Sequence, residues 1–410
     1  MATSFFGGCF MTETFDLVLE RATLSSGPMS QIGIRSGHIA AIATEGENLG
    51  KAHQRVDLAG ALVVPGLVDG HIHLDTTLFG DRWRPHRPCR AGFDVAERIS
   101  IQKETIADAV PLDERASALL ERAVSRGTTH IRTHVEIDVD LGLVHLEGIC
   151  RLREKYQHAV SLEIVAFPRG VIRREGTREL LEEAMRQGAD VVGGLDPAGY
   201  EGDISRHLDT LFEIAEKFDK GIDIHLHDGG SIGLYELNEI ARRTKFRSMQ
   251  GRVAVSHAYA LGELPWNAVA VTADHLAEAG VAIMTNAPGD HPFPPVLALR
   301  RAGVTVFAGN DDVRDSWGPY GDGDMLERAM IIGYRSGFYT DEELQVAFDL
   351  ITSAGAQALA IPDYGLAIGN PADLVVLSAS HIPHAVVSRP KREAVYKAGR
   401  IVARRGEFIQ

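Results

Sequence analysis

Short apolar runs alternate with amphipathic stretches through the middle of the chain. The runs are rich in Val, Ile and Ala and have the length of buried strands, while the stretches between them repeat apolar residues at helical spacing. Strand and helix alternating at about thirty residues is typical of βα units. Eight units predict a closed (β/α)8 barrel, because no glycine-rich turn of a dinucleotide-binding sheet follows the first strand. The predicted strands are residues 61–75, 130–138, 160–168, 189–197, 221–228, 252–258, 281–288 and 304–312.

The two ends of the chain follow a different pattern. Residues 15–60 and 392–408 alternate apolar and polar positions between Gly and Pro turns, which is typical of half-buried strands. Isolated hairpins are marginal, so we expect the two ends to pair with each other. The sequence therefore predicts an α/β protein: a (β/α)8 TIM-like barrel of residues 65–370, with a small β-sandwich domain formed from both termini, residues 11–64 and 371–410.

Composition narrows the classes of function. The formal net charge of −14 over 410 residues argues against nucleic acid or an anionic membrane surface as a partner. No apolar run approaches the roughly 20 residues that cross a bilayer, and the three cysteines have neither paired nor CxxC spacing. These features predict a cytoplasmic protein with free thiols and no secretory signal. Met11 offers a second start, so we interpret residues 1–10 as an upstream start or as foreign to the natural protein.

Two histidines end the first predicted strand, in the segment PGLVDGHIHLD. Positions i and i+2 of a strand share a face, so His71 and His73 point the same way at the carboxyl end, where barrel enzymes keep their chemistry. His225, His257 and Asp311 end the fifth, sixth and eighth predicted strands. Nitrogen and oxygen ligands that converge from several strand ends are what a first-row divalent metal requires, so we expect a metal site.

These segments together resemble the amidohydrolase superfamily over almost the whole chain. The resemblance rests on PGLVDGHIHLD, on the histidines that end the fifth and sixth strands, and on the aspartate that ends the eighth. HIHLDTT, IVAFPRG and GNDDVRDSW are similar to segments of cytosine deaminases, while IDIHLHD and GDGDM are more similar to N-isopropylammelide amidohydrolases of triazine breakdown. The resemblance implies a barrel with a small β domain from both termini. It also implies a deaminase or aminohydrolase that acts on non-peptide C–N bonds.

The same resemblance implies a metal centre. His71, His73, His225 and Asp311 would hold one divalent ion, with zinc or iron expected, and leave a position open for water. Two-metal members of the superfamily bridge their ions with a carboxylated lysine or a glutamate, and the middle strands here offer no such lysine. We therefore expect a single ion, as in the deaminases. Such an ion lowers the pKa of bound water, to about 7 in the best-known zinc case.

Three side chains have catalytic roles by this resemblance. Asp311 would take a proton from the water and pass it toward the leaving amine. His257 would hydrogen-bond the attacking oxygen, and the alternative is a fifth metal ligand. His227 shares the parity of His225 and is the favoured proton shuttle, with an orienting role as its alternative. Cytosine deaminases carry a glutamate where this chain has Asp228, so Asp228 stays open as a shuttle.

Four side chains are candidates for substrate binding. Arg169 stands where cytosine deaminases have a glutamine, and a guanidinium has only donors, so it favours carbonyl or anionic oxygens. Asp312 would receive a ring N–H. Trp317 would stack on a planar heterocycle, or it packs the top of the barrel. Asp228 is the fourth candidate.

We expect the enzyme to remove an amino or alkylamino group from a small N-heterocycle that is cytosine-, pyrimidine- or aminotriazine-like. The alternative is hydrolysis of a cyclic amide or imide C–N bond by the same site. The absence of a metal-bridging lysine argues against this alternative. A non-catalytic binding protein would be expected to have lost Asp311 or His257, and this chain keeps both. The expected partner is the small-molecule substrate, without nucleic acid or membrane, and homo-oligomerisation stays open.

Overall fold

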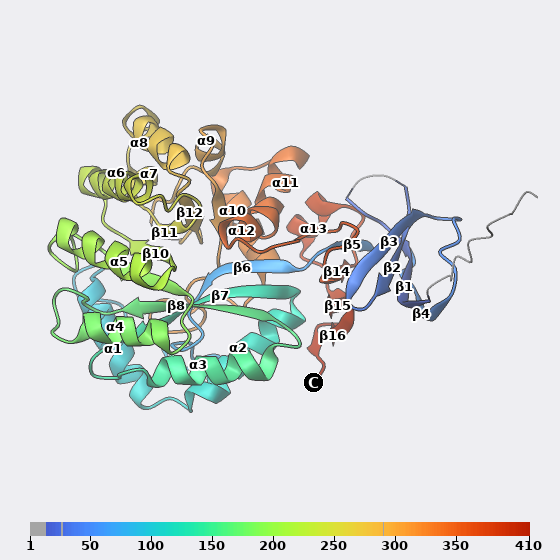
Figure 1. The fold of residues 1–410 in the computed structure, drawn as a ribbon, viewed down its shortest axis with the longest axis horizontal. Coiled ribbons are helices and arrows are strands. Elements are labelled where there is room, and N and C mark those ends of the chain that lie inside the picture. Colours follow the sequence, from blue (N-terminus) through green and yellow to red (C-terminus); the bar gives the residue numbers. More distant parts are fainter. Residues whose placement is uncertain (1–13, 26–27, 290) are drawn as a thin grey trace, which may run out of the picture.

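Eight parallel strands form the centre of the larger lobe, and each is paired with its neighbours in chain order (Figure 1). In this computed structural model the described residues are 14–25, 28–289 and 291–410, so the interpretation of residues 1–10 lies outside them. The eight-stranded arrangement confirms the predicted barrel. Its strands are β6 (Leu67–Ile72), β7 (Thr128–Ile137), β8 (Ser161–Pro168), β9 (Val191–Leu195), β10 (Gly221–Leu226), β11 (Val253–His257), β12 (Ala282–Thr285) and β13 (Val306–Ala308).

The first and last barrel strands meet at the residues predicted to hold the metal. The backbone N–H of Asp311 donates to the carbonyl oxygen of His71 at 2.7 Å, and Asp311 forms a parallel bridge with Ile72. Gly309 makes this approach possible, because a Cβ at that position would lie 2.5 Å from the Cβ of His71. Closure of the barrel therefore brings together two residues that are far apart in the sequence.

Helices cover the outside of the barrel, as the helical spacing between the strands predicts. α5, for example, begins where the Asp203 carboxylate accepts from the N–H of Arg206, and it buries Leu208, Leu211 and Phe212. No helix among the described residues combines the length and the apolar character needed to cross a membrane. The helices are α1 (Val95–Ala107), α2 (Leu112–Ser125), α3 (Val144–Tyr156), α4 (Thr177–Arg186), α5 (Ile204–Phe218), α6 (Gly230–Phe246), α7 (Ala260–Glu263), α8 (Trp266–Glu278), α9 (Val296–Arg301), α10 (Met325–Ser336), α11 (Asp341–Leu350), α12 (Ser353–Ala358) and α13 (Ile382–Ser388).

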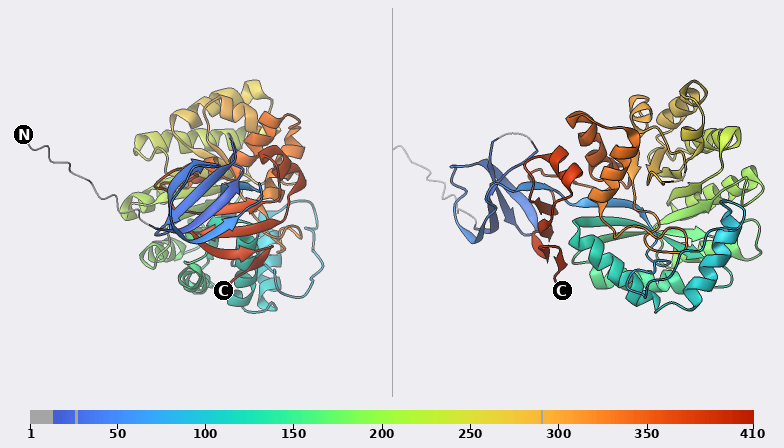
Figure 2. Two further views of the ribbon diagram at one scale, coloured as in Figure 1. Left: turned by 90° about the vertical axis from the view of Figure 1, so that its right-hand side faces the viewer. Right: turned by 180° about the vertical axis from the view of Figure 1, so that it is seen from behind.

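The smaller lobe consists of two sheets built from both ends of the chain (Figure 2). The first contains β1 (Phe15–Ala22), β2 (Ser30–Arg35), β3 (His38–Thr44) and β4 (Ala52–Asp57). The second joins β5 (Leu62–Pro65) to four strands of the C-terminal end, through antiparallel pairing of β5 with β14. Those four strands are β14 (Leu374–Leu377), β15 (Arg392–Lys397), β16 (Arg400–Arg404) and β17 (Glu407–Phe408).

A separate apolar core holds the two sheets of the smaller lobe together. Leu19 and Ile32 of the first sheet are buried against Val63, Leu374 and Tyr396 of the second. Burial of apolar surface between facing sheets is what stabilises a β-sandwich. The predicted small β domain formed from both termini is therefore confirmed. The exact boundaries at residues 64/65 and 370/371 stay predictions.

Candidate active site

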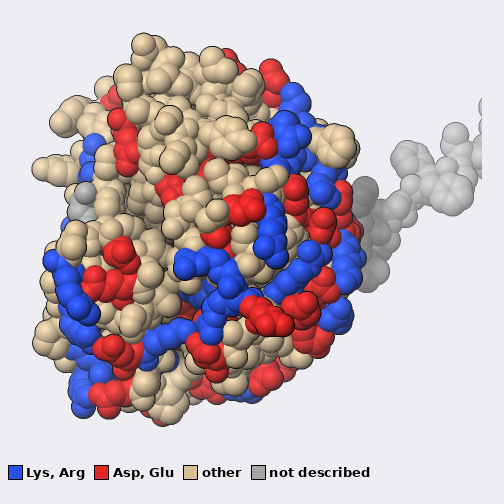
Figure 3. Space-filling view, turned by 90° about the vertical axis from the view of Figure 1, so that its left-hand side faces the viewer, with Lys and Arg blue, Asp and Glu red and all other residues tan. Residues whose placement is uncertain are grey.

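A cavity of about 660 Å³ opens at the carboxyl ends of the barrel strands. Figure 3 shows that end of the larger lobe, where charged side chains gather over the lower half and are fewer above. His71 is fully buried and lies just beneath the cavity lining. Most of the residues predicted from the sequence line this cavity, namely His73, Arg169, His225, His227, His257, Asp311, Asp312 and Trp317.

Four of these side chains converge on one point. The Nε2 atom of His73 lies 3.3 Å from Nε2 of His71 and 3.3 Å from Nε2 of His225. The Oδ1 atom of Asp311 lies 3.3 Å from Nε2 of His71 and 3.5 Å from Nε2 of His73. One ligand atom from each of the four residues lies within 4.8 Å of all the others. The structure therefore brings the whole predicted ligand set together.

The spacing of these atoms fits a bound metal ion. Ligands at about 2.1 Å from a tetrahedral ion lie about 3.4 Å from one another. Unprotonated imidazole nitrogens that face each other at such distances repel unless a cation or a proton lies between them. Three imidazoles and one carboxylate are also a donor set that suits zinc or iron.

A hydrogen-bond chain sets the tautomer of His71. The hydroxyl of Ser256 donates to Asp223 at 2.8 Å, so its oxygen must accept from Nδ1 of His71 at 2.9 Å. Nδ1 of His71 therefore carries the proton, and the lone pair of Nε2 points toward the other ligands. A partner of this kind on the second ring nitrogen is the usual arrangement around a metal-binding histidine.

The two oxygens of Asp311 have different surroundings. Oδ1 faces the histidine nitrogens, whereas Oδ2 accepts a hydrogen bond of 2.7 Å from the side-chain amide of Asn286. Nδ1 of His257 lies 4.0 Å from Oδ2 of Asp311 and has no hydrogen-bond partner among the described residues. Asp311 thus keeps one oxygen for an ion and turns the other toward the cavity.

His227 is held by a carboxylate at the end of β9. Its Nδ1 lies 2.8 Å from Oδ2 of Asp196, and its backbone N–H donates to Oδ1 of the same residue at 2.6 Å. Burial alone would lower the pKa of His227, but the charge and hydrogen bond of Asp196 raise it above its ordinary value. The ring of His227 stacks on that of His257 at 4.6 Å. Nε2 of His227 is therefore available to act on a ligand in the cavity.

Asp228 points elsewhere, although it is the next residue. Its carboxylate accepts from the backbone N–H groups of Ala198 at 3.2 Å and Gly199 at 3.0 Å. It also shares a hydrogen bond with Glu236, whose burial and proximity to Asp228 raise its pKa to about 9. Asp228 is not among the described residues that line the cavity. The structure therefore does not bring Asp228 to the position predicted for substrate binding.

The remaining residues predicted to bind substrate lie in the cavity wall. Arg169 is 3 % exposed, pairs with Glu136 at 2.5 Å, and lies 4.5 Å above the Phe167 ring. The indole Nε1 of Trp317 donates to Gln102 at 2.5 Å. Burial and the nearby charge of Asp311 raise the pKa of Asp312 well above its ordinary range.

Comparison with known proteins identifies the family. A model described as "Amidohydrolase family" matches residues 54–403. The chain belongs to the amidohydrolase family. It is 31 % identical over 403 residues to N-isopropylammelide isopropyl amidohydrolase of Pseudomonas sp. (strain ADP), covering 96 % of this chain and 98 % of the relative.

Two solved structures of related amidohydrolases match over nearly the whole chain. N-isopropylammelide isopropylaminohydrolase from Burkholderia multivorans ATCC 17616 has a TM-score of 0.91 and 41 % identity, over 96 % of this chain and 99 % of that one. The 5-methylcytosine deaminase from Klebsiella pneumoniae, liganded with 5-fluorocytosine, has a TM-score of 0.83 and 25 % identity over the same shares. The predicted branch of the superfamily is therefore confirmed. The protein is a hydrolytic enzyme of the deaminase and aminohydrolase type, and the superfamily is metal-dependent.

Two polar residues of this amidohydrolase site were not among those predicted from the sequence. Asn286 bonds Asp311 and Asp196 bonds His227, yet neither was singled out. Both follow a barrel strand directly, β12 and β9 respectively, as His73 follows β6 and His227 follows β10. Polar residues at all eight strand ends, rather than histidines alone, were the signal that could have found them.

Proposed function

We propose that this amidohydrolase removes an amino or alkylamino group from a small N-heterocycle that is cytosine-, pyrimidine- or aminotriazine-like and carries ring carbonyls. The observation that carries the proposal is the convergence of His71, His73, His225 and Asp311 beneath a cavity that His227 also lines. The relatives that support it are an isopropylammelide aminohydrolase and a methylcytosine deaminase. These relatives do not favour the alternative of opening a cyclic amide.

The four ligands would hold one divalent ion, which would lower the pKa of water and so supply a nucleophile at neutral pH. Asp311 would accept the proton of the attacking water at Oδ2, because Oδ1 is the oxygen that faces Nε2 of His71 and His73. Asn286 keeps that oxygen in place through its amide N–H. His257 donates a hydrogen bond to the attacking oxygen, which stabilises the charge that develops there.

His227 protonates the substrate on the side away from Asp311. An amine is a poor leaving group unless it gains a proton as the C–N bond breaks. His227 reaches the cavity and is oriented by Asp196, with Nδ1 bonded and Nε2 free to deliver the proton. Asp228, engaged with the N–H groups of Ala198 and Gly199, is left out of this step.

Recognition of the heterocycle falls to Arg169, Trp317 and Asp312. The guanidinium of Arg169 offers donors only, which match carbonyl oxygens on the ring. The carboxyl group of Asp312 receives a ring N–H, and Trp317 covers the flat face. Cytosine, with a single carbonyl, should therefore be a poor substrate beside heterocycles with two or more. A kcat/KM for cytosine above about 10⁴ M⁻¹s⁻¹ would overturn this account of the pocket.

A panel of heterocycles tests the proposal. Purified enzyme is assayed for release of ammonia or alkylamine from aminopyrimidines, oxo-aminotriazines and their N-alkyl derivatives, with cyclic amides and imides as the competing class. We expect amine release from oxygen-rich rings and loss of turnover after chelation. Ring opening of a cyclic amide without amine release would favour the alternative reaction, and binding without turnover would favour a binding protein.

Elemental analysis tests the number of ions. One ion per chain is expected, because the middle strands offer no lysine that could bridge two ions. Close to two ions per chain at the barrel mouth would contradict this expectation. The same measurement shows whether zinc or iron is bound.

A further inference from the structure

Gln102 of α1 lines the cavity and connects Trp317, which also lines it, to Glu136 behind it. Its Nε2 donates to Oε1 of Glu136 at 2.7 Å, and its Oε1 accepts from the indole Nε1 of Trp317 at 2.5 Å. The side chain is almost completely buried. Both ends of the amide are therefore engaged by the protein, one by Glu136 and the other by Trp317.

The chemistry of the two neighbours demands an amide at this position. A carboxylate only accepts hydrogen bonds and an indole N–H only donates them. A side chain between them must therefore donate at one end and accept at the other. Because a flipped amide would set donor against donor and acceptor against acceptor, its orientation is fixed by Glu136 and Trp317.

Glu136 extends the bridge to the substrate-binding arginine. The same Oε1 that accepts from Gln102 accepts from Nε of Arg169 at 2.7 Å, and it pairs with Nη2 of Arg169 at 2.5 Å. Both partners of this ion pair are nearly inaccessible to solvent. The guanidinium is further confined between Phe167 at 4.5 Å and Trp317 at 5.7 Å. Arg169 is therefore held by Glu136 along the edge that carries Nε and Nη2 and lies against two aromatic rings, which leaves Nη1 for a ligand.

Further bonds fix α1 against the cavity wall. Nη1 of Arg98 donates to the carbonyl oxygen of Ser316 at 3.0 Å, next to Trp317. Nζ of Lys103 lies 3.0 Å from the carboxylate of Asp138, which follows β7. The helix is thus attached to the loops after β13 and β7, and Gln102 lies between these two attachments.

We infer that Gln102 is a positioning residue that determines substrate recognition, because it holds Trp317 directly and Arg169 through Glu136. This inference rests on the proposed function for its substrate, a planar heterocycle with ring carbonyls. Gln102 has no contact with the metal ligands in the bonds described above, so its loss affects binding of the ring rather than the chemical step.

Two substitutions separate the two arms of the bridge. Gln102→Met removes both hydrogen bonds at nearly constant volume. Gln102→Glu keeps an acceptor for the Trp317 indole but sets a second carboxylate against Glu136, so it disturbs Arg169 alone. Gln345→Met is the matched control, because Gln345 also donates to a carboxylate, Asp349, on α11.

Steady-state kinetics and metal content give the first readout. With an oxo-heterocycle as substrate, both Gln102 variants should raise KM about ten- to a hundredfold, the worth of one or two hydrogen bonds to charged groups. kcat should stay within about threefold of wild type, and metal content should not change. A wild-type KM in Gln102→Met would overturn the inference. A joint loss of kcat, substrate affinity and metal content would overturn it as well. Gln102→Met adds no charge and keeps the test decisive should Gln102→Glu fail to fold.

Indole fluorescence gives a second readout that needs no turnover. In a Trp83→Phe, Trp266→Phe background, Trp317 is the only indole of the chain. Gln102→Met should shift its emission and increase quenching by acrylamide, whereas Gln102→Glu and Gln345→Met should leave both unchanged. An unchanged emission in Gln102→Met would overturn the inference. Failure of the wild-type enzyme to act on any heterocycle would overturn the proposed function instead, and the emission would still decide whether Gln102 holds Trp317.

Discussion

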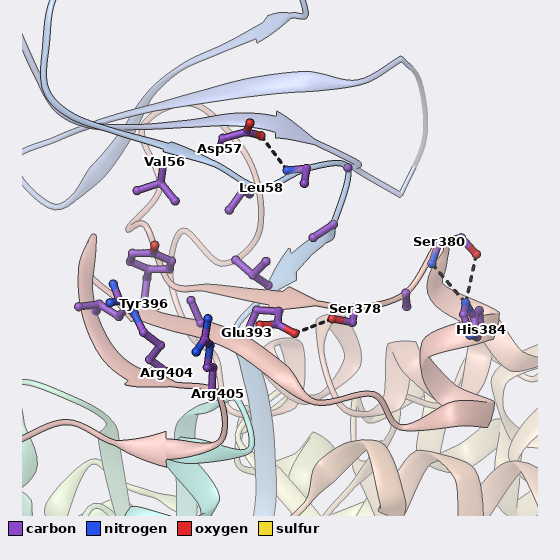
Figure 4. A pocket seen from close by; sticks show the side chains of 17 residues that line it. Val56, Asp57, Leu58, Ser378, Ser380, His384, Glu393, Tyr396, Arg404 and Arg405 are labelled. Atoms are coloured by element: carbon purple, nitrogen blue, oxygen red, sulfur yellow. Dashed lines mark hydrogen bonds between the residues drawn. The ribbon is translucent and has the colours of Figure 1, made fainter.

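Two cavities of nearly equal volume differ in how their polar groups are bonded. The cavity at the barrel mouth measures about 660 Å³, and a groove in the smaller lobe, between β4, β15 and β16, measures about 690 Å³ (Figure 4). Polar side chains of the groove bond close neighbours, as Ser378 bonds Glu393 at 2.7 Å and Ser380 bonds His384 at 3.1 Å. Among the described residues, no buried polar atom without a partner belongs to the groove lining.

The cavity at the barrel mouth, in contrast, is lined by buried polar atoms that lack hydrogen-bond partners among the described residues. Six of its lining residues carry a buried polar atom for which the described part of the chain offers no partner, and burial of such atoms costs free energy. They include Nδ1 of His225, Nδ1 of His257 and Oδ1 of Asn286. A fold bears this cost where a ligand or an ion completes the bonding. Volume therefore does not distinguish the two cavities, whereas unsatisfied buried polar atoms do.

Removal of the base at the mouth should have the largest effect. Asp311→Asn keeps an oxygen that can bind an ion but loses the carboxylate that accepts the proton of the water. We expect kcat to fall by about 10⁴-fold, at the upper end of the contribution of general base catalysis, while much of the metal is retained. Kinetics with metal analysis measure this. A variant with nearly wild-type kcat would refute the role of Asp311.

Loss of the proton shuttle, His227, should have the next largest effect on kcat. His227→Ala should lower kcat by about 10²–10⁴-fold with metal content unchanged, because the leaving amine no longer receives a proton. Asp228→Ala is the matched control one residue away and should stay active. If the two results are exchanged, the shuttle is Asp228 and the chemistry follows the cytosine deaminase pattern.

The sequence predicted the strand ends better than the contacts between them. Eight apolar runs placed His71, His225 and Asp311 at one end of a barrel, because parallel strands bring their carboxyl ends together. No comparable regularity locates Gln102, whose partner Trp317 lies 215 residues away on another loop. Helix periodicity places Gln102 on a helix but does not say which loop that helix meets.

Adjacent residues show the same limit at finer scale. Strand parity favoured His227 over Asp228 because a regular strand alternates its faces. β10 ends at Leu226, so both residues lie beyond the regular strand. The hydrogen bonds of Asp196 and of the backbone at Ala198, rather than parity, determine where the two side chains point. Such bonds depend on loop geometry, which periodicity does not encode.

The carboxyl pair of Glu236 and Asp228, beside the barrel mouth, should have a moderate effect on the free energy of unfolding that depends on pH. The pKa of Glu236 is raised to about 9 in the folded protein from an ordinary value of 4.5, chiefly by burial and then by the charge of Asp228. The folded state therefore keeps a proton that the unfolded chain loses above pH 4.5. This contribution to stability is fully present below pH 4.5 and is lost as pH rises toward 9.

Glu236→Gln tests this dependence, because glutamine stays neutral and can donate to Asp228 as the protonated acid does. We expect the variant to match wild type near pH 5 and to have a free energy of unfolding about 1–2 kcal/mol higher at pH 8. Urea unfolding at several pH values measures the difference between the two proteins. An identical slope of stability against pH in both would show that Glu236 is ionised in the folded state.

The smallest effect is expected in the groove of the smaller lobe. Glu393 lines the groove, is exposed, and has Ser378 as its hydrogen-bond partner, a bond that glutamine can preserve in Glu393→Gln. Substitutions of exposed polar residues change the free energy of unfolding by about 0.5 kcal/mol or less. kcat/KM should stay within about twofold of wild type, measured beside His227→Ala under the same conditions. A tenfold loss in kcat/KM without loss of stability would mean that the groove is coupled to the cavity at the barrel mouth. Satisfied hydrogen bonding of the groove's polar groups would then not be enough to identify the groove as purely structural.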